Sequence, residues 1–486
     1  MLYDLGMLNP VDISVLTFEQ RGDLIVRLLE QIALLESGIT ALEARLTKDS
    51  HNSSKPPSSD GLRKPKSLRT ASGRRPGGQA GHPGQTLKQV ASCDRQVIHP
   101  LPSVCEACGM PLVAEGATLT EERRQVFDLP EVPVQVTEHR VQTQVCSCGK
   151  AHRSAFPKEV SSAAAYGPVV RSRAIYLTQA QLLPVARAAQ ILSDCYGLAL
   201  SPGTLQAWIF EAGATLAPVA AQISEGVIQA EVGHFDESGL RVGKQLHWLH
   251  SASTAILTWY GYHRNRGAEA MRALGVLPKF QGVAVHDGFR PYRAFGKAHG
   301  LCNAHHLREL IFLDETLPGQ RWPRGLIDLL REANREVNQA RVEGTTLSPE
   351  RLRYYQTCYL AWVTEGQGVH PEQVRTSERR GRVRQTPAFN LLHRLSRYAE
   401  DVLRFLTDPR VPFDNNQAER DIRMPKLKQK ISGAFRTPHG ASAFCTIRSV
   451  LATLRKQNQK ILPNRSIALS GHTPRHPILR ITELNS

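Results

Sequence analysis

Three acidic residues that stand far apart in the sequence constrain this chain of 486 residues more than any other feature. Asp236 follows the largely apolar run 232–235, and Asp287 follows the run 283–286, which is rich in valine. A Ser or Gly turn residue comes soon after each acid. This pattern is typical of a strand that delivers a carboxylate at its own carboxyl end, where a sheet opens to ligands. We therefore expect Asp236 and Asp287 at the ends of two strands.

The third acid, Glu419, is expected on a helix. Asp414 is predicted to be the N-cap of this helix, with Gln417 three residues later completing a capping box. The residues that then share one helical face, at i, i+3, i+4 and i+7 spacing, are Asn416, Glu419, Arg420 and Arg423. An acid flanked by arginines on one face suits a site that binds a metal and phosphates together.

Length, charge and cysteine usage limit the class of protein. A chain of this length is too long for one compact core, so three or four domains are expected. The net charge of +17 favours a polyanionic partner. The nine cysteines are paired or scattered, which fits a reducing compartment and a metal site rather than a disulfide scaffold. No apolar run approaches the ~20 residues that span a bilayer, and no signal peptide is recognisable, so a soluble intracellular protein without membrane contact is expected.

Residues 1–47 contain a heptad seam. Its members are Ile25, Leu28, Ile32, Leu35, Ile39, Leu42 and Leu46. Isoleucine at most a positions with leucine at the d positions favours a parallel two-stranded coiled coil. The alternative is a single amphipathic helix packed on its own domain, and Gly38 weakens the coil somewhat.

Residues 48–92 are rich in Ser, Pro, Gly, Lys and Arg and hold few core residues, so a flexible basic linker is expected. Arg63, Lys64, Arg74 and Arg75 could follow a phosphate backbone. A solubilising tether would have the same composition.

Residues 93–156 contain two cysteine pairs, each followed by Gly. The pairs are Cys105 with Cys108 and Cys146 with Cys148. With a valine-rich hairpin expected between the pairs, this pattern predicts a zinc ribbon whose four ligands make the Zn²⁺ structural. The second pair has one intervening residue where two is commoner, so His152 or Cys93 could replace one of its ligands.

Residues 160–227 are predicted to be helical. A helix over 185–195 ends at Gly197, and Ser201 then caps a second helix that has Pro202 in its first turn. This is the outline of a helix-turn-helix that binds DNA. Helical hairpins that never touch DNA share the outline, so both interpretations stay open.

The remaining sequence predicts a multidomain chain with an α/β core of RNase H-like order and a large all-α insertion. Strands and one helix over 228–302 form the first part of the core, and helices over 303–410 form the insertion. Residues 411–465 complete the core with a last helix, and 466–486 form a tail. Cys302 and His305 are a possible half-site for a metal, although such a pair more often steadies the first helix of an insertion.

The chain resembles the transposases of the insertion-sequence 66 family, which are bacterial DDE transposases. Besides the paired cysteines, the motifs that carry the resemblance are NSSKPPSSDG (52–61), SPGTLQAW (201–208), DESG (236–239), WLH (248–250), HDGFRPYRAF (286–295), CNAHHLREL (302–310) and DNNQAERDIR (414–423). The spacing of the second cysteine pair and the sequence Asp287-Gly288-Phe289 depart from the expected pattern. Neither departure removes an acid.

The resemblance implies that Asp236, Asp287 and Glu419 are a catalytic triad that holds two Mg²⁺ ions, which Mn²⁺ can replace. It implies double-stranded DNA as the partner, at the element ends and at the target. A homodimer or higher assembly, small accessory proteins of the same element and a cytoplasmic, nucleoid-associated location in bacteria are also implied.

The implied chemistry is an in-line displacement at phosphorus, which divalent ions promote by stabilising the attacking and leaving oxygens. Mg²⁺ requires oxygen ligands, and carboxylates supply them. Four basic residues near the third acid are expected to hold phosphates, namely Arg420, Arg423, Lys426 and Lys430.

Two other functions remain as alternatives. One is a catalytically silent, zinc-containing DNA-binding protein derived from a transposase, and the intact acids speak against it. The other is a nuclease of the same fold without joining activity. A dimerising coil and several DNA-binding modules speak against that alternative, because transposition must bring two element ends together.

Overall fold

The computed structural model describes residues 17–46, 48–53, 88–99, 102–111, 122–128, 134–157, 160, 162–374 and 383–462. The chain divides into two compact units, one formed by Met1–Ser67 with His139–Ser486 and the other by Leu68–Glu138. The linker residues Arg63, Lys64, Arg74 and Arg75 lie outside the described residues, as does the predicted tail.

Helix α1 (Phe18–Leu46) is continuous through the predicted heptad seam. All seven seam residues have at least 47% of their surface exposed, so the described part of this chain does not cover them. A single helix packed on its own domain would bury that face. The predicted helix is therefore confirmed, and its pairing with a second chain stays a prediction.

The second cysteine pair lies in a short hairpin formed by β1 (Thr143–Val145) and β2 (Ala151–Arg153). The hairpin predicted between the two cysteine pairs is not found in the described residues, since 134–142 run without strand structure. Instead, each cysteine pair is flanked by its own short antiparallel contact. Strands β1 and β2 flank Cys146 and Cys148, and a single bridge between Val104 and Pro111 flanks Cys105 and Cys108. Within 134–142 no neighbouring strand among the described residues accepts the backbone hydrogen bonds, so β propensity alone does not make this part a strand.

The helical region contains α2 (Pro168–Ile175), a π-helical turn η3 (Tyr176–Ala180), α3 (Val185–Tyr196) and α4 (Pro202–Ile228). Gly197 ends α3 with a positive φ of 68°, and the Ser201 hydroxyl accepts the Thr204 N–H at 3.0 Å as the N-cap of α4. The predicted helix, glycine turn and capped helix are confirmed as elements.

Helix α4 is much longer than a recognition helix requires, because one face is apolar along its whole length. Leu205, Trp208, Leu216 and Ile223 are buried on this face. They belong to one hydrophobic cluster that also includes residues of the sheet and of α12 (Pro438–Lys456). The helical region therefore shares its core with the rest of its unit.

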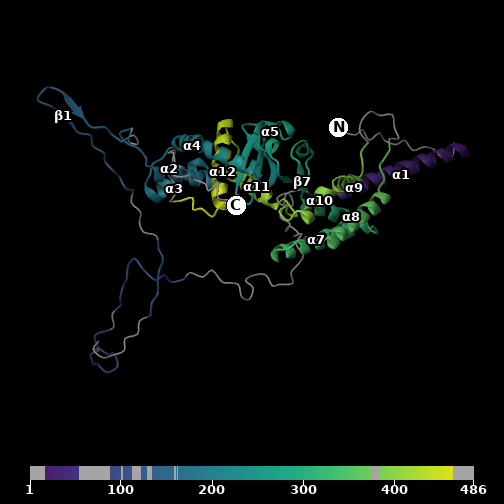
Figure 1. Cartoon of the computed structure of the whole chain (residues 1–486), viewed down its shortest axis with the longest axis horizontal. Coiled ribbons are helices and arrows are strands. Elements are labelled where there is room, and N and C mark those ends of the chain that lie inside the picture. Colours follow the sequence, from purple (N-terminus) through teal and green to yellow (C-terminus); the bar gives the residue numbers. More distant parts are fainter. Residues whose placement is uncertain are drawn as a thin grey trace. The chain divides into compact units, whose positions relative to one another are not determined.

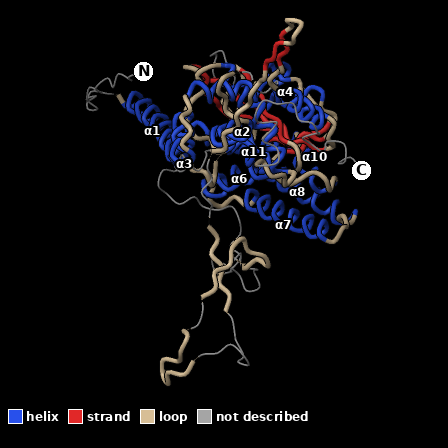
Figure 2. Tube along the Cα trace, turned by 90° about the vertical axis from the view of Figure 1, so that its left-hand side faces the viewer, coloured by secondary structure: helices blue, strands red, loops and turns tan. Residues whose placement is uncertain are grey.

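A five-stranded mixed sheet forms the centre of this unit. Its strands are β3 (Val232–Val242), β4 (Gln245–Ser253), β5 (Thr258–His263), β6 (Val283–His286) and β7 (Ala298–Leu301). They lie in the order β5-β4-β3-β6-β7, with β3, β4 and β5 antiparallel and β6 and β7 parallel to β3. Figure 2 shows these strands in red among the blue helices.

The prediction that a strand ends at Asp236 is wrong. Strand β3 continues through Asp236 to Val242, because β4 pairs with it antiparallel from His234 onward. Its parallel pairing with β6 ends at His234. Asp236 therefore lies inside β3, two residues beyond His234, which is the last residue of β3 that pairs with the parallel strand β6.

Between the strands lie α5 (Ala268–Leu274) and the short turns η4 (Leu277–Lys279) and η5 (Arg290–Ala294). After β7 come the helices of the predicted insertion: α6 (Asn303–Thr316), α7 (Trp322–Val342), α8 (Pro349–Val369), α9 (Pro387–Arg397) and α10 (Ala399–Thr407). They gather beside β7 (Figure 1) around the fully buried Trp322, Tyr355 and Tyr359. Helix α11 (Asn416–Ser432) then returns the chain to β3 and β4.

Candidate active site

Asp236 lies within β3, and Asp287 follows directly after β6, the strand that pairs with β3 in parallel. Strands β3 and β6 pair residue for residue up to His234 with Val285, two residues before each acid, and the charge of Asp287 is close enough to raise the pKa of Asp236. Each carboxylate accepts a local backbone N–H at 2.8 Å, from Glu237 and Phe289 respectively. Gly288 supplies the turn after Asp287 with a φ of 89°, which favours glycine and accounts for this residue in the motif.

The Asp236 carboxyl is held in a strongly unfavourable electrostatic position. Burial raises its pKa to about 8, with further increases from the neighbouring carboxylates of Glu237 and Asp287. The N–H of Glu237 and the charge of Lys426 lower it only in part. The repulsion between buried carboxylates of this kind is relieved when a cation binds between them.

This pKa predicts a pH dependence for the metal-free protein. The folded state keeps a proton on Asp236 up to about pH 8, whereas the unfolded chain releases it near pH 4. The free energy of unfolding is therefore expected to fall as the pH rises from about 4 to about 8, by an amount on the order of several kcal/mol. In Asp236→Asn this loss should be absent.

The measurement is urea unfolding with a chelator present, repeated from pH 4 to pH 9. The exposed Asp194→Asn serves as the control and should follow the natural chain. Parallel curves for Asp236→Asn and the natural chain would contradict the account.

Glu237 is a residue of the candidate site that the sequence analysis missed. Its side chain is fully buried, pairs with Arg266 at 2.6 Å and accepts a hydrogen bond from the Tyr292 hydroxyl. Arg266 in turn lies over Phe289, with its guanidinium carbon 4.0 Å from the ring centroid. Glu237 follows Asp236 directly and Phe289 closely follows Asp287, so these contacts couple the two acidic segments.

Asn415 is a second missed residue, and it connects the start of α11 to the sheet. Its side chain donates to the Phe235 carbonyl and bonds to His234 Nδ1, both at 2.9 Å. Since the amide nitrogen is used by Phe235, the amide oxygen must accept from His234, which assigns the proton to Nδ1. The Asn415 N–H reaches the Cys302 sulfur at 3.1 Å. Asn415 thus links the start of α11, which carries Glu419, to β3 and to Cys302.

The predicted capping box at the start of α11 is wrong. Asn415 occupies the N-cap position, and Asp414 instead accepts the Asn416 N–H at 3.0 Å. The Gln417 side chain donates to the carbonyl of Thr254 and is not available to Asp414. The long-range bonds of Asn415 and Gln417 outweigh the local capping preference. Glu419 is still in the first turn of the helix, as expected.

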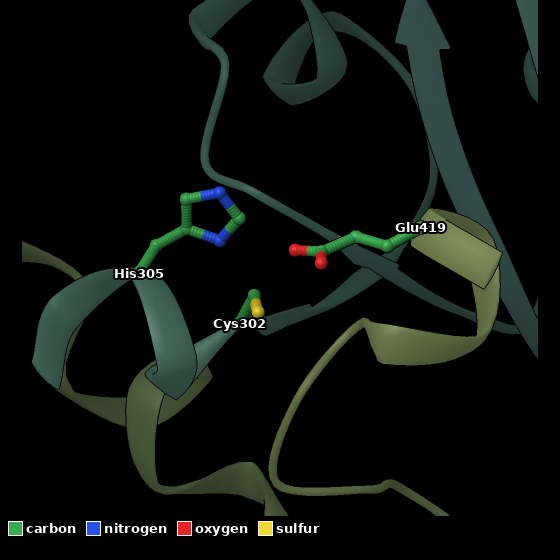
Figure 3. A group of neighbouring side chains, drawn as sticks. All are labelled: Cys302, His305 and Glu419. Atoms are coloured by element: carbon green, nitrogen blue, oxygen red, sulfur yellow. The ribbon is translucent and has the colours of Figure 1, made fainter. Parts of the chain in front are cut away.

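The structure places Glu419 beside the half-site considered in the insertion. The ligand atoms of Cys302, His305 and Glu419 all lie within 4.8 Å of one another. Figure 3 shows the imidazole and the carboxylate directed toward each other, with the thiol below them. Among the described residues, this is the group in which three or more His, Cys, Asp or Glu side chains lie close enough to share one metal ion. Of the three predicted acids it contains Glu419, but neither Asp236 nor Asp287. Glu419 and Asp287 both raise the pKa of His305, although burial keeps that pKa below its usual value.

Helix α11, which has Glu419 in its first turn, also carries four exposed basic side chains. They are Arg420, Arg423, Lys426 and Lys430. Lys426 is close enough to Asp236 to lower the pKa of that carboxyl. The predicted basic flank is therefore present on the described surface, and its contact with phosphates stays a prediction.

Both cysteine pairs have the local geometry of zinc knuckles. In each, the glycine N–H donates to the carbonyl of the first cysteine at 2.8 Å, and the glycine has a positive φ. Backbone N–H groups, chiefly of Ala107, lower the pKa of Cys105, and those around Cys148 lower the pKa of Cys146. Stabilised thiolates in tight turns fit Zn²⁺. Each pair is described by itself, and a shared ion stays a prediction.

These observations define a chain with a buried acidic cluster on a mixed sheet, a helical insertion between its second and third acids, and a basic helix beside them. A family model described as "Transposase IS66 family" matches residues 163–443, and the chain belongs to this family. Membership indicates a transposase, an enzyme that binds, cleaves and transfers DNA. The resemblance noted from the motifs is thereby confirmed.

A second family model, of unknown function and designated DUF6444, matches residues 12–88. No curated protein matches the chain. None of the described helices combines the length and apolar character that crossing a bilayer requires.

Proposed function

We propose that this chain cleaves and joins DNA through a DDE triad formed by Asp236, Asp287 and Glu419 on an RNase H-like core. The observation that carries the proposal is that Asp236 in β3 and Asp287 after the parallel strand β6 lie close enough for the charge of Asp287 to raise the pKa of Asp236, while α11 carries the third acid. Membership of a transposase family supports the same reaction class. The sheet order supports the RNase H-like core.

The residues present fit divalent Mg²⁺. Asp236 and Asp287 offer hard oxygen ligands whose mutual repulsion a cation would relieve, and that repulsion raises the pKa of Asp236. Bound there, Mg²⁺ would stabilise the oxygens of the attacking and leaving groups during displacement at phosphorus. Glu419 would complete the ligand set from α11.

The protein's own residues then bind and orient the DNA. Lys426 and its basic neighbours on α11 hold phosphates beside the acids, because lysine and arginine bind a phosphate backbone without reading its sequence. Glu237, fixed by Arg266 and Tyr292, sets the position of Asp236 through the adjacent backbone.

The parts before the core serve DNA binding and assembly in this proposal. The zinc ribbon, the helix pair α3 and α4, and the basic linker bind the element ends, and α1 pairs two protomers. A catalytically silent DNA-binding protein is the alternative, but it would have no use for three acids placed in this way.

The ribbon gives one direct prediction. Cys105→Ser or Cys146→Ser should each lose one Zn²⁺ per chain and unfold residues 93–156, since metal binding and folding are coupled in small zinc modules. The core should remain folded because it has its own apolar cluster. Elemental analysis and limited proteolysis check this, with the half-buried Cys358→Ser as control. A natural chain purified without zinc would end the claim.

The function itself is tested with a DNA substrate that carries the inverted repeats flanking the gene. The purified chain should nick the element ends in Mg²⁺ and join them to a target DNA, and a chelator should abolish both steps. End binding without cleavage would favour the silent alternative, and cleavage without joining would favour a nuclease.

A further inference from the structure

Cys302, His305 and Glu419 form a group of potential metal ligands that includes neither Asp236 nor Asp287. Cys302 is the N-cap of α6 and His305 lies in the first turn of that helix, so the i, i+3 spacing points both side chains the same way. Glu419 meets them from the first turn of α11 (Figure 3). Their donor atoms lie within 4.8 Å of one another, and ligands around one zinc ion are about 3.5 Å apart. Zinc binding would therefore draw the three donor atoms closer together.

An independent observation points to a missing ligand. His305 Nδ1 is shielded from solvent and has no hydrogen-bond partner among the described residues. A buried polar atom without a partner costs free energy. A metal ion bound by this nitrogen would remove that cost.

The Cys302 sulfur lies beside the other two donor atoms. It is buried, which raises the pKa of the thiol to about 12, and it accepts the Asn415 N–H at 3.1 Å, which favours the thiolate in part. Binding replaces the S–H bond by a metal–sulfur bond and releases one proton to solvent. No oxidant or further reactant is needed.

The chemistry of the three ligands selects the ion. A thiolate and an imidazole suit Zn²⁺ and are poor ligands for Mg²⁺, which prefers oxygen. Three protein ligands leave a fourth position for water or a phosphate oxygen. The same carboxylate of Glu419 is required by the proposed magnesium site.

We propose that Cys302, His305 and Glu419 bind Zn²⁺ and that this binding withdraws Glu419 from catalysis, so that zinc holds the enzyme inactive. The regulatory part rests on the proposed function, because it needs Glu419 to act in DNA cleavage. The binding part does not.

The binding part is tested on the full-length chain by counting zinc after dialysis against a weak chelator. The natural chain should hold one more Zn²⁺ than Cys302→Ser or His305→Asn, whatever the ribbon contributes. Their zinc affinity at this site should fall at least about a hundredfold. Cys445→Ser, which alters a buried thiol outside the group, is the matched control and should keep the full count.

Cobalt substitution gives a second readout. Co²⁺ bound here should show a sulfur-to-metal charge-transfer band that disappears in Cys302→Ser and changes in His305→Asn. Circular dichroism checks that each variant is folded, and either variant alone decides the question. An equal zinc count in the natural chain and a folded variant would overturn the site.

The regulatory part is tested by comparing, for each protein, the rate of DNA cleavage with and without added Zn²⁺. Adding micromolar Zn²⁺ at constant Mg²⁺ should reduce cleavage by the natural chain at least about tenfold and should reduce that of His305→Asn far less. A second zinc ion that leaves cleavage unchanged would overturn the regulation. If the natural chain cleaves no DNA at all, the proposed function fails, while the zinc count still decides the site.

Discussion

Asp236→Asn, Asp287→Asn and Glu419→Gln should each reduce end cleavage at least about a hundredfold, the loss that follows removal of one preorganised electrostatic group. Each substitution keeps the shape of the side chain and removes the charge that holds a cation. DNA affinity should change little, because it comes from basic side chains elsewhere on the chain. The measurement is end cleavage in Mg²⁺ together with a binding titration on the same preparations.

The matched control for this set is Glu350→Gln, which removes a carboxylate that is exposed at the start of α8. It should cleave like the natural chain. A triad variant that cleaves at the natural rate removes that residue from the active site. A variant that loses binding and cleavage together would instead assign its acid a structural role.

The second large effect is expected at the coil. Replacing Ile32 and Leu35 with Lys should make the chain monomeric through α1 and prevent the pairing of two element ends. Each seam residue contributes about 1.5 to 3 kcal/mol when fully covered, although ordering the chains offsets much of this. The two substitutions also set like charges in adjacent layers of the dimer. Single-end binding should survive.

Light scattering and a two-end synapsis assay measure the result. The control is Val26→Lys with Ala33→Lys, which adds the same charge at the positions directly after Ile25 and Ile32. That control should stay dimeric and should pair ends. If the seam variant pairs ends as well as the natural chain, α1 is not the assembly device.

Local patterns predicted most of the elements because the signals that produce them are local. The heptad spacing predicts α1, and the sequence Ser201-Pro202 predicts the start of α4, which the serine caps as expected. The valine-rich run 283–286 before Asp287 predicts β6, which covers the same residues. Physical preferences of the backbone and of single side chains are sufficient in these cases.

Contacts between distant segments account for what the sequence did not predict. Strand β3 extends past Asp236 because β4 continues to pair with it, and no local signal carries that pairing. The capping box fails because Asn415 and Gln417 bond to residues about 160 to 180 positions away.

The candidate site shows the same limit. Asp236, Asp287 and Glu419 are recognisable from their motifs, whereas Glu237 resembles an ordinary surface acid until the structure buries it against Arg266. The proximity of Cys302 to Glu419 depends on where the insertion leaves and rejoins the sheet. A Cys-x-x-His sequence alone carries no such information.

The most direct test of the central claim is to locate the ions. Crystals of the full-length chain with an element end and Mn²⁺, measured at the manganese absorption edge, would show the positions of bound metal. The account predicts anomalous peaks held by the carboxylates of Asp236, Asp287 and Glu419 next to a DNA phosphate. Manganese bound elsewhere, with these three carboxylates free of metal while DNA occupies the site, would contradict it.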